Sequence, residues 1–338
     1  MSDRVTVLGA GSWGTALAIH LGRLGHQVTL WGRNPAVTES LGSGAEHVGP
    51  PGAHVPQGLR VTSDLEAACR GTQALVIACP SRAMRELAGK ILPFAPPDAL
   101  VISTAKGIER ETHLLMTGVL AEVLGEQSAA RIGALSGPSF AKEVALGMPT
   151  VVTAAAADID TADRIQALFN GPTFRVYTSP DIVGVEVGGA AKNVIALAAG
   201  VSDGMGFGHN TRAALITRGL AEIVRLAEAM GANPQTLAGL SGMGDLVLTC
   251  TGDLSRNRRV GVRLGQGERL ADIVASMNEV AEGVHNTRSV YQMAQSISVE
   301  VPITEQMYHV VEEGKDPKRA VVDLMTRRLR SEIGPRNN

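Results

Sequence analysis

One lysine stands in the middle of a stretch of small and apolar residues. Lys192 lies within residues 185–200, and the residues three and four positions away from it are not acidic. Burial disfavours the charged form of a lysine and lowers its pKa toward the range of an acid–base catalyst. We therefore interpret Lys192 as a proton donor or acceptor. The alternative is a lysine whose alkyl stem lets its amine reach the surface.

Two further charged residues could share a site with this lysine. Lys106 follows an expected strand in a turn of small residues, where parallel sheets bind cofactor and substrate. It could equally be an ordinary exposed turn lysine. Asp245 is the one acid in the glycine-rich segment 239–250. It could hold a substrate hydroxyl, orient Lys192, or belong to a turn.

Residues 254–259 have the composition of an anion site. Ser255 is expected to cap a helix whose first turn carries Arg256 and Asn257. Helix N–H groups, together with guanidinium, amide and hydroxyl donors, can bind a phosphate or a carboxylate. Three arginines at a helix start oppose the helix dipole unless an anion offsets them. This conflict favours a binding role over a solvated basic surface.

A glycine motif near the start of the chain predicts a dinucleotide site. Gly9, Gly11 and Gly14 match G-x-G-x-x-G between an expected buried strand at 5–8 and an expected helix at 15–24. The glycines allow a tight turn, close approach of a pyrophosphate and close packing of helix on strand. The helix N-terminus attracts the phosphates. The alternative is a glycine turn without a ligand.

The second expected strand, at 27–31, is followed by Arg33 instead of the acid that is typical of NAD-selective sites. A guanidinium can pair with a 2′-phosphate and stack on adenine. We therefore expect NADP(H) to be preferred over NAD(H), which the site could also accept. The alternative is a solvated surface arginine.

The elements that position these residues alternate between strands and helices up to about residue 180. Further strands are expected at 59–62, 74–78, 99–103, 131–135, 150–154 and 173–176. This alternation predicts a doubly wound parallel sheet of Rossmann type. Residues 42–58 are rich in Gly and Pro and predict a loop. Its histidines, His47 and His54, have no cysteine or carboxylate cluster beside them, so we expect no metal site.

No strand pattern recurs after residue 180. Ser179 and Pro180 are expected to cap and begin a long core helix. Further helices are expected at 211–230, 256–264, 270–277, 287–296, 302–312 and 318–330. The fold class is therefore α/β: a dinucleotide-binding domain over 1–180, an all-helical domain over 181–330, and a polar tail over 331–338, with the active cleft between the domains.

Composition argues against several function classes. The formal net charge is −2, so no overall field indicates a nucleic acid or an anionic membrane as partner. No signal-peptide pattern precedes the first strand, and no uncharged apolar run of eighteen residues predicts a membrane span. Cys69, Cys79 and Cys250 form no C-x-x-C pair, and we interpret them as buried free thiols of a cytoplasmic protein.

Seven segments together resemble the bacterial NAD(P)-dependent glycerol-3-phosphate dehydrogenase family. The resemblance spans about residues 4–325. The segments are 9–16 (GAGSWGTA), 104–109 (TAKGIE), 135–141 (LSGPSFA), 191–196 (AKNVIA), 242–246 (GMGDL) with 249–250 (TC), 255–257 (SRN) and 280–283 (VAEG). The family often has an aromatic residue in the loop after the second helix, whereas this chain has VGPP at 48–51.

The resemblance implies the reversible reduction of dihydroxyacetone phosphate to sn-glycerol 3-phosphate for phospholipid synthesis. It also implies a helical domain similar to the C-terminal domain of 6-phosphogluconate dehydrogenase. Lys192 matches the family's proton donor or acceptor. The positions that match substrate contacts are Lys106, Gly137, Ser139, Lys192, Asp245, Ser255, Arg256 and Asn257. The positions that match cofactor contacts, besides the glycines of the motif, are Ser12, Trp13, Arg33, Lys106, Ala141, Arg256, Val280 and Glu282.

Two alternatives remain at this point. A related two-domain dehydrogenase of the β-hydroxyacid or ketopantoate reductase type would place a carboxylate on Arg256 and Asn257. A nucleotide-sensing regulator would bind the dinucleotide without turnover, but it has no need of a buried lysine between domains. The expected partner is a small phosphorylated substrate, and the sequence is compatible with a homodimer.

Overall fold

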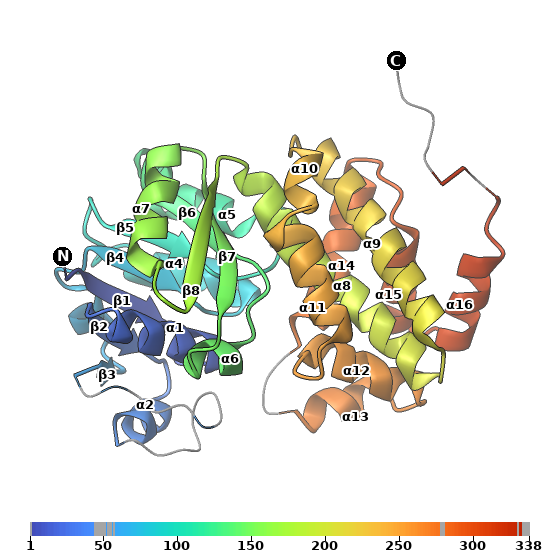
Figure 1. Ribbon diagram of the computed structural model, residues 1–338, viewed down its shortest axis with the longest axis horizontal. Coiled ribbons are helices and arrows are strands. Elements are labelled where there is room, and N and C mark those ends of the chain that lie inside the picture. The colour runs from blue at the N-terminus through green and yellow to red at the C-terminus, as the bar shows by residue number, and fades with distance from the viewer. Residues whose placement is uncertain are drawn as a thin grey trace.

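The computed structural model describes residues 2–43, 52, 56, 58–277, 281–329 and 331–332. Figure 1 shows two halves: a sheet covered by helices, which we call the sheet half, and a bundle of helices, which we call the helical half. The predicted loop at 42–58, with His47 and His54, and the polar tail lie largely outside the described residues.

The sheet half contains eight strands in the order β3-β2-β1-β4-β5-β6-β7-β8. Their bounds are β1 (Arg4–Leu8), β2 (Gln27–Trp31), β3 (Arg60–Thr62), β4 (Ala74–Ile77), β5 (Leu100–Ser103), β6 (Ile132–Ser136), β7 (Thr150–Ala156) and β8 (Phe174–Ser179). The predicted Rossmann-type order is therefore present.

The predicted doubly wound parallel sheet is confirmed except at one pair, because β7 runs antiparallel to β6. The physical reason is the connection between these strands. Its helix α6 (Ala141–Ala145) has five residues and rises only about 7.5 Å, whereas β6 extends about 16 Å. The chain cannot return to the start of β6 along such a helix. The next strand, β7, therefore begins at the end of the sheet where β6 ends.

Helices cover both faces of the sheet and form a hydrophobic core with each. One face carries α1 (Ser12–Arg23), α6 and α7 (Ile159–Phe169); the other carries α3 (Leu65–Cys69), α4 (Met84–Ile91) and α5 (Met116–Leu124). The short α2 (Pro35–Gly42) follows β2. Burial on both faces explains why the central strands β4 and β5 are almost uninterrupted apolar runs.

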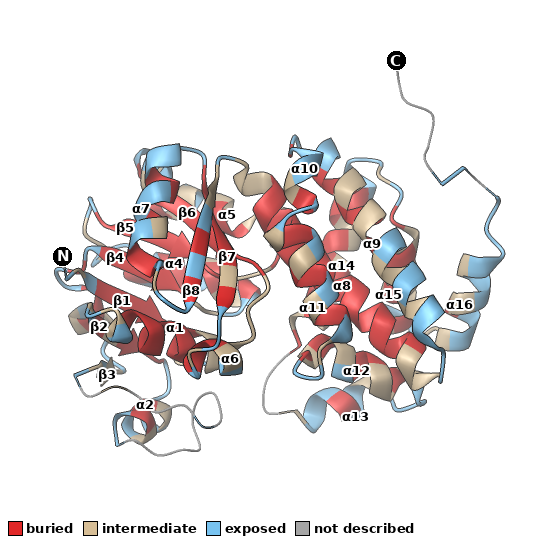
Figure 2. Ribbon diagram, viewed as in Figure 1, coloured by how far each residue is buried: buried red, intermediate tan, exposed pale blue. Residues whose placement is uncertain are grey.

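The helical half is built around α8 (Ile182–Gly204), which is buried along almost its whole length (Figure 2). Around it lie α9 (His209–Ala229), α10 (Pro234–Leu237), a π-helical turn (Leu240–Gly244), α11 (Asp245–Thr251), α12 (Arg256–Gly265), α13 (Leu270–Ala275), α14 (Glu282–Ser296), α15 (Pro302–Glu312) and α16 (Pro317–Met325). Among the described helices, α8 alone is long and apolar enough to cross a bilayer, but 89% of that apolar window is buried in the protein.

The predicted start of α8 was wrong by two residues. Asp181, not Ser179 or Pro180, caps the helix, and its carboxylate accepts a hydrogen bond from the backbone N–H of Gly184 at 2.9 Å. Ser179 ends β8, and its hydroxyl accepts a hydrogen bond from the Asp181 N–H at 3.1 Å. Asp181 is the cap because its side chain reaches a backbone N–H of the first turn that has no partner within the helix.

Glycines let α8 and α12 touch through their backbones. A Cβ atom on Gly200 would lie 2.1 Å from the carbonyl oxygen of Arg258, and one on Gly261 would lie 2.1 Å from that of Leu197. Gly204 makes an equally close approach to α12. Side chains at these positions would force the two helices apart.

Cys69, Cys79 and Cys250 are free thiols, as predicted. Cys69 and Cys250 are buried, but Cys79 is only partly covered, which corrects the expectation that all three are buried. Cys79 follows β4 at the end of the sheet, where the core gives way to the turn that precedes α4.

Candidate functional site

Two lysines from different halves of the molecule share one buried carboxylate. Lys192 Nζ lies 2.6 Å from Asp245 Oδ1, and Lys106 Nζ lies 2.6 Å from Asp245 Oδ2. The Asp245 side chain is only 2% exposed, and that of Lys192 8%. Lys192 also donates to Thr249 Oγ1 at 2.7 Å, and Lys106 to the Gly137 carbonyl at 3.1 Å. The structure thus unites three of the predicted residues in one cluster.

Burial and the charges within this cluster shift the pKa values of its members. Burial lowers the pKa of Lys192 to about 8, with the charge of Asp245 acting against this shift and the charge of Lys106 adding to it. Burial alone would raise the pKa of Asp245, but the two ammonium groups outweigh it and hold that pKa below the ordinary value. At neutral pH the cluster therefore contains a carboxylate, and Lys192 can both give and take a proton.

Three elements bring these charges together. Lys192 projects from the middle of α8, Asp245 begins α11 with Thr249 one turn later, and Lys106 follows β5. Gly189 lets α8 approach the sheet half, because a Cβ atom there would lie 3.0 Å from Ser136 Oγ and 3.4 Å from Lys106 Cγ. The small residues of α8 are therefore needed where the two halves meet.

The predicted anion site lies at the start of α12. Ser255 caps this helix as predicted, accepting a hydrogen bond from the Arg258 N–H at 3.2 Å. The Asn257 amide donates to Asn193 Oδ1 and accepts from the Gly283 N–H, each at 2.8 Å. Asn257 thereby joins the first turn of α12 to the residue next to Lys192 and to the start of α14.

The glycine turn has the shape that a dinucleotide phosphate requires. Gly9 has φ +131°, and a Cβ atom on Gly14 would lie 1.8 Å from the Gly9 carbonyl oxygen. Gly11 faces open space, and within the described part of the chain no side chain caps the N-terminus of α1. Because N–H groups of an uncapped helix bind anions, this turn fits a pyrophosphate. Ser12 and Trp13 occupy the first turn of the same helix.

Further predicted residues lie on segments of the sheet half that follow strands. Arg33 is exposed just after β2, and Gly137, Ser139 and Ala141 form the turn from β6 into α6. The Gly137 carbonyl accepts hydrogen bonds from Lys106 and, at 3.1 Å, from Ser139 Oγ.

Cofactor positions were also predicted at the start of α14. Glu282 begins this helix and accepts a hydrogen bond from Ser81 Oγ of the sheet half at 2.7 Å. Arg256 is partly buried at the start of α12. Val280, another predicted cofactor contact, lies outside the described residues.

Sequence reasoning assigned no role to Thr249, although it lies in one of the segments of the resemblance, and did not consider Asn286. Thr249 lies four residues after Asp245, so the helical spacing of the two polar side chains was an available signal. Asn286 Nδ2 donates to the carbonyl oxygens of Lys106, at 2.8 Å, and Ala190, at 3.2 Å. No local pattern indicates these contacts, because the partners are 180 and 96 residues away.

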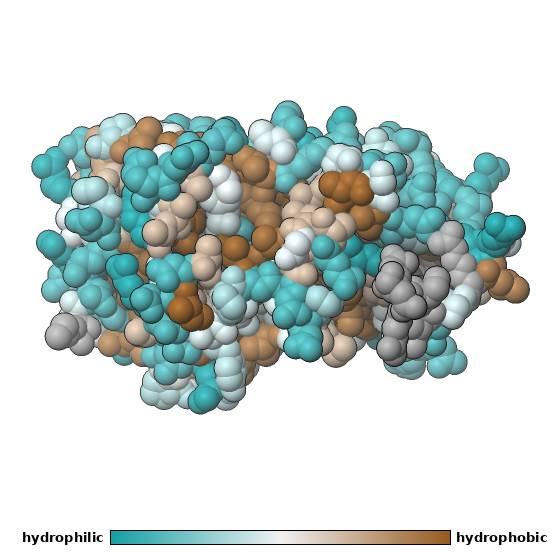
Figure 3. Space-filling view, turned by 90° about the horizontal axis from the view of Figure 1, so that it is seen from above, coloured by the Kyte–Doolittle hydropathy of each residue, from teal (hydrophilic) through white to brown (hydrophobic). Residues whose placement is uncertain are grey.

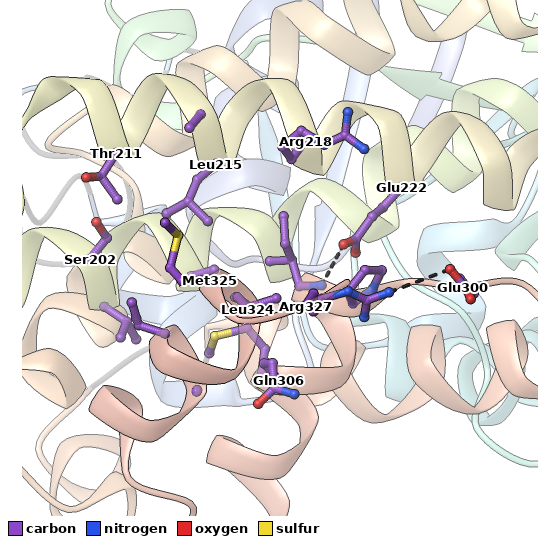
Figure 4. A pocket seen from close by; sticks show the side chains of 18 of the residues that line it. Ser202, Thr211, Leu215, Arg218, Glu222, Glu300, Gln306, Leu324, Met325 and Arg327 are labelled. Carbon is purple, nitrogen blue, oxygen red and sulfur yellow. Dashed lines mark hydrogen bonds and ion pairs between the residues drawn. The ribbon is translucent and has the colours of Figure 1, made fainter. Parts of the chain in front are cut away.

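Surface and cavity properties do not suggest a competing centre in the described part of the chain. Figure 3 shows hydrophilic residues interspersed with smaller hydrophobic patches on one face of the molecule. A groove of about 900 Å³ lies between α9, α15, α16 and the segment after α16 (Figure 4). Its buried Glu222 carboxylate is already bound by backbone N–H groups at the start of α15. No group of three or more His, Cys, Asp or Glu residues gathers as a metal site in the described ranges.

Comparison with known proteins adds independent findings. Family models described as the N-terminus and C-terminus of NAD-dependent glycerol-3-phosphate dehydrogenase match residues 4–162 and 181–322. A glycerol-3-phosphate dehydrogenase [NAD(P)+] of Geobacter metallireducens is 52% identical over 335 residues, covering 99% of this chain and 100% of the relative. One from Geobacter sp. (strain M21) is 51% identical, covering 98% of this chain and 99% of the relative.

A crystal structure of glycerol-3-phosphate dehydrogenase from Coxiella burnetii is similar along almost the whole chain. It superposes with a TM-score of 0.91 and is 38% identical in sequence, covering 96% of this chain and 99% of that chain. The similarity thus includes both halves and the boundary at which the lysine cluster lies.

Proposed function

Because the chain belongs to the NAD-dependent glycerol-3-phosphate dehydrogenase family, we propose a mechanism for the interconversion of dihydroxyacetone phosphate and sn-glycerol 3-phosphate in which Lys192 is the proton donor and acceptor. The observation that supports it most is the buried cluster of Lys192, Asp245 and Lys106. We also propose that residues 1–180 and 181–330 form the cofactor-binding and catalytic domains.

In the direction of reduction, the Lys192 ammonium gives its proton to the ketone oxygen, which becomes the hydroxyl of the product. Asp245 and Thr249 hold the amine in place for this transfer. The positive charge of Lys106 stabilises the negative charge that develops on the oxygen. In the reverse direction, the neutral amine of Lys192 takes the proton from the hydroxyl.

The start of α12 is the proposed site for the substrate phosphate. The guanidinium of Arg256 and the N–H groups at the start of this ten-residue helix favour an anion there. Ser255 and Asn257 set the shape of this turn through their hydrogen bonds. Gly137 and Ser139 are proposed to contact the substrate from the sheet half, beside Lys106.

The residues that would hold the cofactor are the glycine turn (Gly9, Gly11 and Gly14), Ser12, Trp13, Arg33, Lys106, Ala141, Arg256, Val280 and Glu282. When bound, the nicotinamide supplies the hydride for the ketone carbon. Because Gly11 faces open space before an uncapped helix, the turn can accept the phosphates of the dinucleotide.

The function is tested by following NADPH and NADH oxidation at 340 nm with dihydroxyacetone phosphate, ketopantoate and other small keto acids. We expect turnover with dihydroxyacetone phosphate to exceed that with the keto acids by at least about 10²-fold, since the keto acids lack the phosphate for which α12 is proposed. Equal turnover with a keto acid would support the carboxylate alternative. Cofactor binding without turnover on any ketone would support the sensing alternative.

We propose a preference for NADPH, supported by the exposed guanidinium of Arg33 at the end of β2. In Arg33→Asp, the ratio of kcat/KM for NADPH to that for NADH should fall at least about 10-fold, because a carboxylate repels a 2′-phosphate. Arg164→Asp, an equal charge change at an exposed site on α7, is the control. An unchanged ratio in Arg33→Asp would remove the proposal.

A cytoplasmic location and a homodimeric assembly are further proposals. The free state of all three cysteines suits a reducing compartment. Fractionation of cells and sedimentation equilibrium of the purified chain test these two proposals separately.

A further inference from the structure

We propose that Asn286 is a positioning residue that fixes the segment of Lys106 against the helix of Lys192, an inference that rests on the proposed role of Lys192. Asn286 lies on α14, one turn after Glu282, and is only 1% exposed. It belongs to neither lysine-bearing segment. From a third element, α14, its side chain contacts both of these segments.

The hydrogen bonds of Asn286 determine which way its amide faces. Its Nδ2 atom lies 2.8 Å from the Lys106 carbonyl oxygen and 3.2 Å from that of Ala190. Both partners are acceptors, so only the NH₂ group of the amide can satisfy them, and its two N–H bonds suffice for both. One side chain therefore joins the turn after β5 to α8, two residues before Lys192.

Asn286 is tightly packed against the turn that carries Lys106. A Cβ atom on Gly107 would lie 3.1 Å from Asn286 Oδ1 and 2.3 Å from Ser81 Cβ. The turn after β5 therefore packs against the asparagine and against the 3-10 turn that precedes α4 at the same time. A displacement of this turn would need Asn286 to move as well.

Other contacts of α14 make this helix a suitable support. Glu282 accepts a hydrogen bond from Ser81 of the sheet half, and the Gly283 N–H donates to Asn257 of α12. The first turns of α14 thus touch the sheet half, α8 and α12. A residue held here can transmit the position of each segment to the others.

The position of Lys106 affects the chemistry of Lys192 through charge. Lys106 and Lys192 each lie 2.6 Å from a different oxygen of Asp245, so a shift of the turn changes both the pairing and the field at Lys192. Asp245, Lys106 and Cys250 are the titratable groups that act on Lys192. Because the Lys106 ammonium lowers the pKa of Lys192, its retreat should raise that pKa.

The test compares Asn286→Ala and Asn286→Leu with Thr287→Ala in the full chain. Leucine has the same branching and the same number of side-chain heavy atoms as asparagine, with a somewhat larger volume, but it removes the donors. Thr287 is the matched control, because it is fully buried on the same helix and its hydroxyl donates within α14 to the Gly283 carbonyl. For each variant, kcat and KM for dihydroxyacetone phosphate, the kcat–pH profile and the Tm are measured.

We expect both Asn286 variants to lower kcat at least about 10-fold relative to Thr287→Ala at a similar Tm. We also expect the alkaline limb of the kcat–pH profile to move to higher pH in the Asn286 variants only. If kcat and the pH profile match those of Thr287→Ala, Asn286 has only a structural role and the inference is overturned. If one Asn286 variant does not fold, the other decides by the same criteria; if neither folds while Thr287→Ala does, the positioning role is rejected in favour of a structural one.

Lys192→Met, measured alongside, separates this inference from the function on which it rests. Near-parental turnover in Lys192→Met would refute the acid–base role itself. Loss of turnover in Lys192→Met, together with unaltered Asn286 variants, would refute only the positioning role.

Discussion

At the scale of single residues, burial and neighbouring charges determine the pKa of the Lys192 amine, and they do not all act in the same direction. Burial lowers its pKa most, Asp245 raises it, and Lys106 lowers it, which together give about 8. An exposed lysine near 10.4 would hold its proton too tightly to take part in both directions of a reversible reaction near neutral pH. The ion pair with Asp245 keeps the amine in place, and burial lowers its pKa into the range in which it can exchange a proton.

This leads to a prediction for Lys192. Lys192→Met should lower kcat by about 10² to 10⁴-fold, the usual contribution of a general acid. In the parent, kcat for ketone reduction should fall as pH rises through about 8, because the donor must be protonated, whereas kcat for alcohol oxidation should rise over the same window.

Both parts can be measured by stopped-flow or steady-state spectrophotometry with saturating cofactor. Lys318→Met, at an exposed site on α16, serves as control and should behave like the parent. Equal pH profiles for reduction and oxidation would contradict the assignment of Lys192 as the group that titrates.

At the scale of elements, the glycines between α8 and α12 decide how near the anion site lies to the lysine. Gly200 and Gly204 on α8 face Gly261 and Gly265 on α12, with the same four-residue spacing on each helix. Small residues at this spacing let two helix backbones come into contact. Arg256 and Asn257 begin α12, so the contact of this helix with α8 also determines their position.

Gly261→Ala should destabilise the protein by about 1–3 kcal/mol, because the new methyl group would overlap the backbone of α8. It should also raise KM for dihydroxyacetone phosphate, since α12 must move away from α8. Urea unfolding and steady-state kinetics measure the two effects.

Gly89→Ala is the matched control for this prediction. Gly89 lies within α4 with no atom within 4 Å of an added Cβ, so alanine there should stabilise the protein by up to about 1 kcal/mol. Equal effects of the two substitutions would show that the contact between α8 and α12 is not close.

At the scale of the whole molecule, buried polar contacts join the two halves. Asp245 pairs with Lys106 of the sheet half, and Glu186 of α8 accepts a hydrogen bond from the Thr117 N–H at the start of α5 at 3.1 Å. A polar group buried without its partner costs free energy, so separation of the halves is costly. We therefore expect the two halves to unfold together.

Asp245→Asn should weaken this coupling. It leaves two ammonium groups without their shared counter-charge, which typically costs about 3–5 kcal/mol for a buried pair. Both tryptophans, Trp13 and Trp31, lie in the sheet half, whereas far-UV circular dichroism also reports on the helical half. The two signals should give one urea transition in the parent and separate midpoints in Asp245→Asn.

Asp253→Asn is the control for this experiment, because the Asp253 side chain is 98% exposed in its pair with Arg258. It should keep a single transition near the parental midpoint. Coincident, unshifted transitions in Asp245→Asn would show that the shared carboxylate contributes nothing to the docking of the halves.

Features that depend on neighbours along the chain could be predicted without the structure. The strand, glycine turn and helix at the start, the core helix around Lys192, and the Ser255 cap all follow from the spacing and conformational preferences of a few consecutive residues. These features were sufficient to predict the sheet and the helical half, whereas many of the candidate site residues came from the resemblance to a known family.

Contacts between residues that are distant in the chain became apparent only from the folded molecule. The direction of β7 follows from the short α6, and the partner of Lys192 lies 53 residues away on α11. Asn286 meets Lys106 and Ala190 across still longer separations. Local pattern carries no information about such pairs, because packing of whole helices against the sheet brings them together, and burial then gives each charge its pKa.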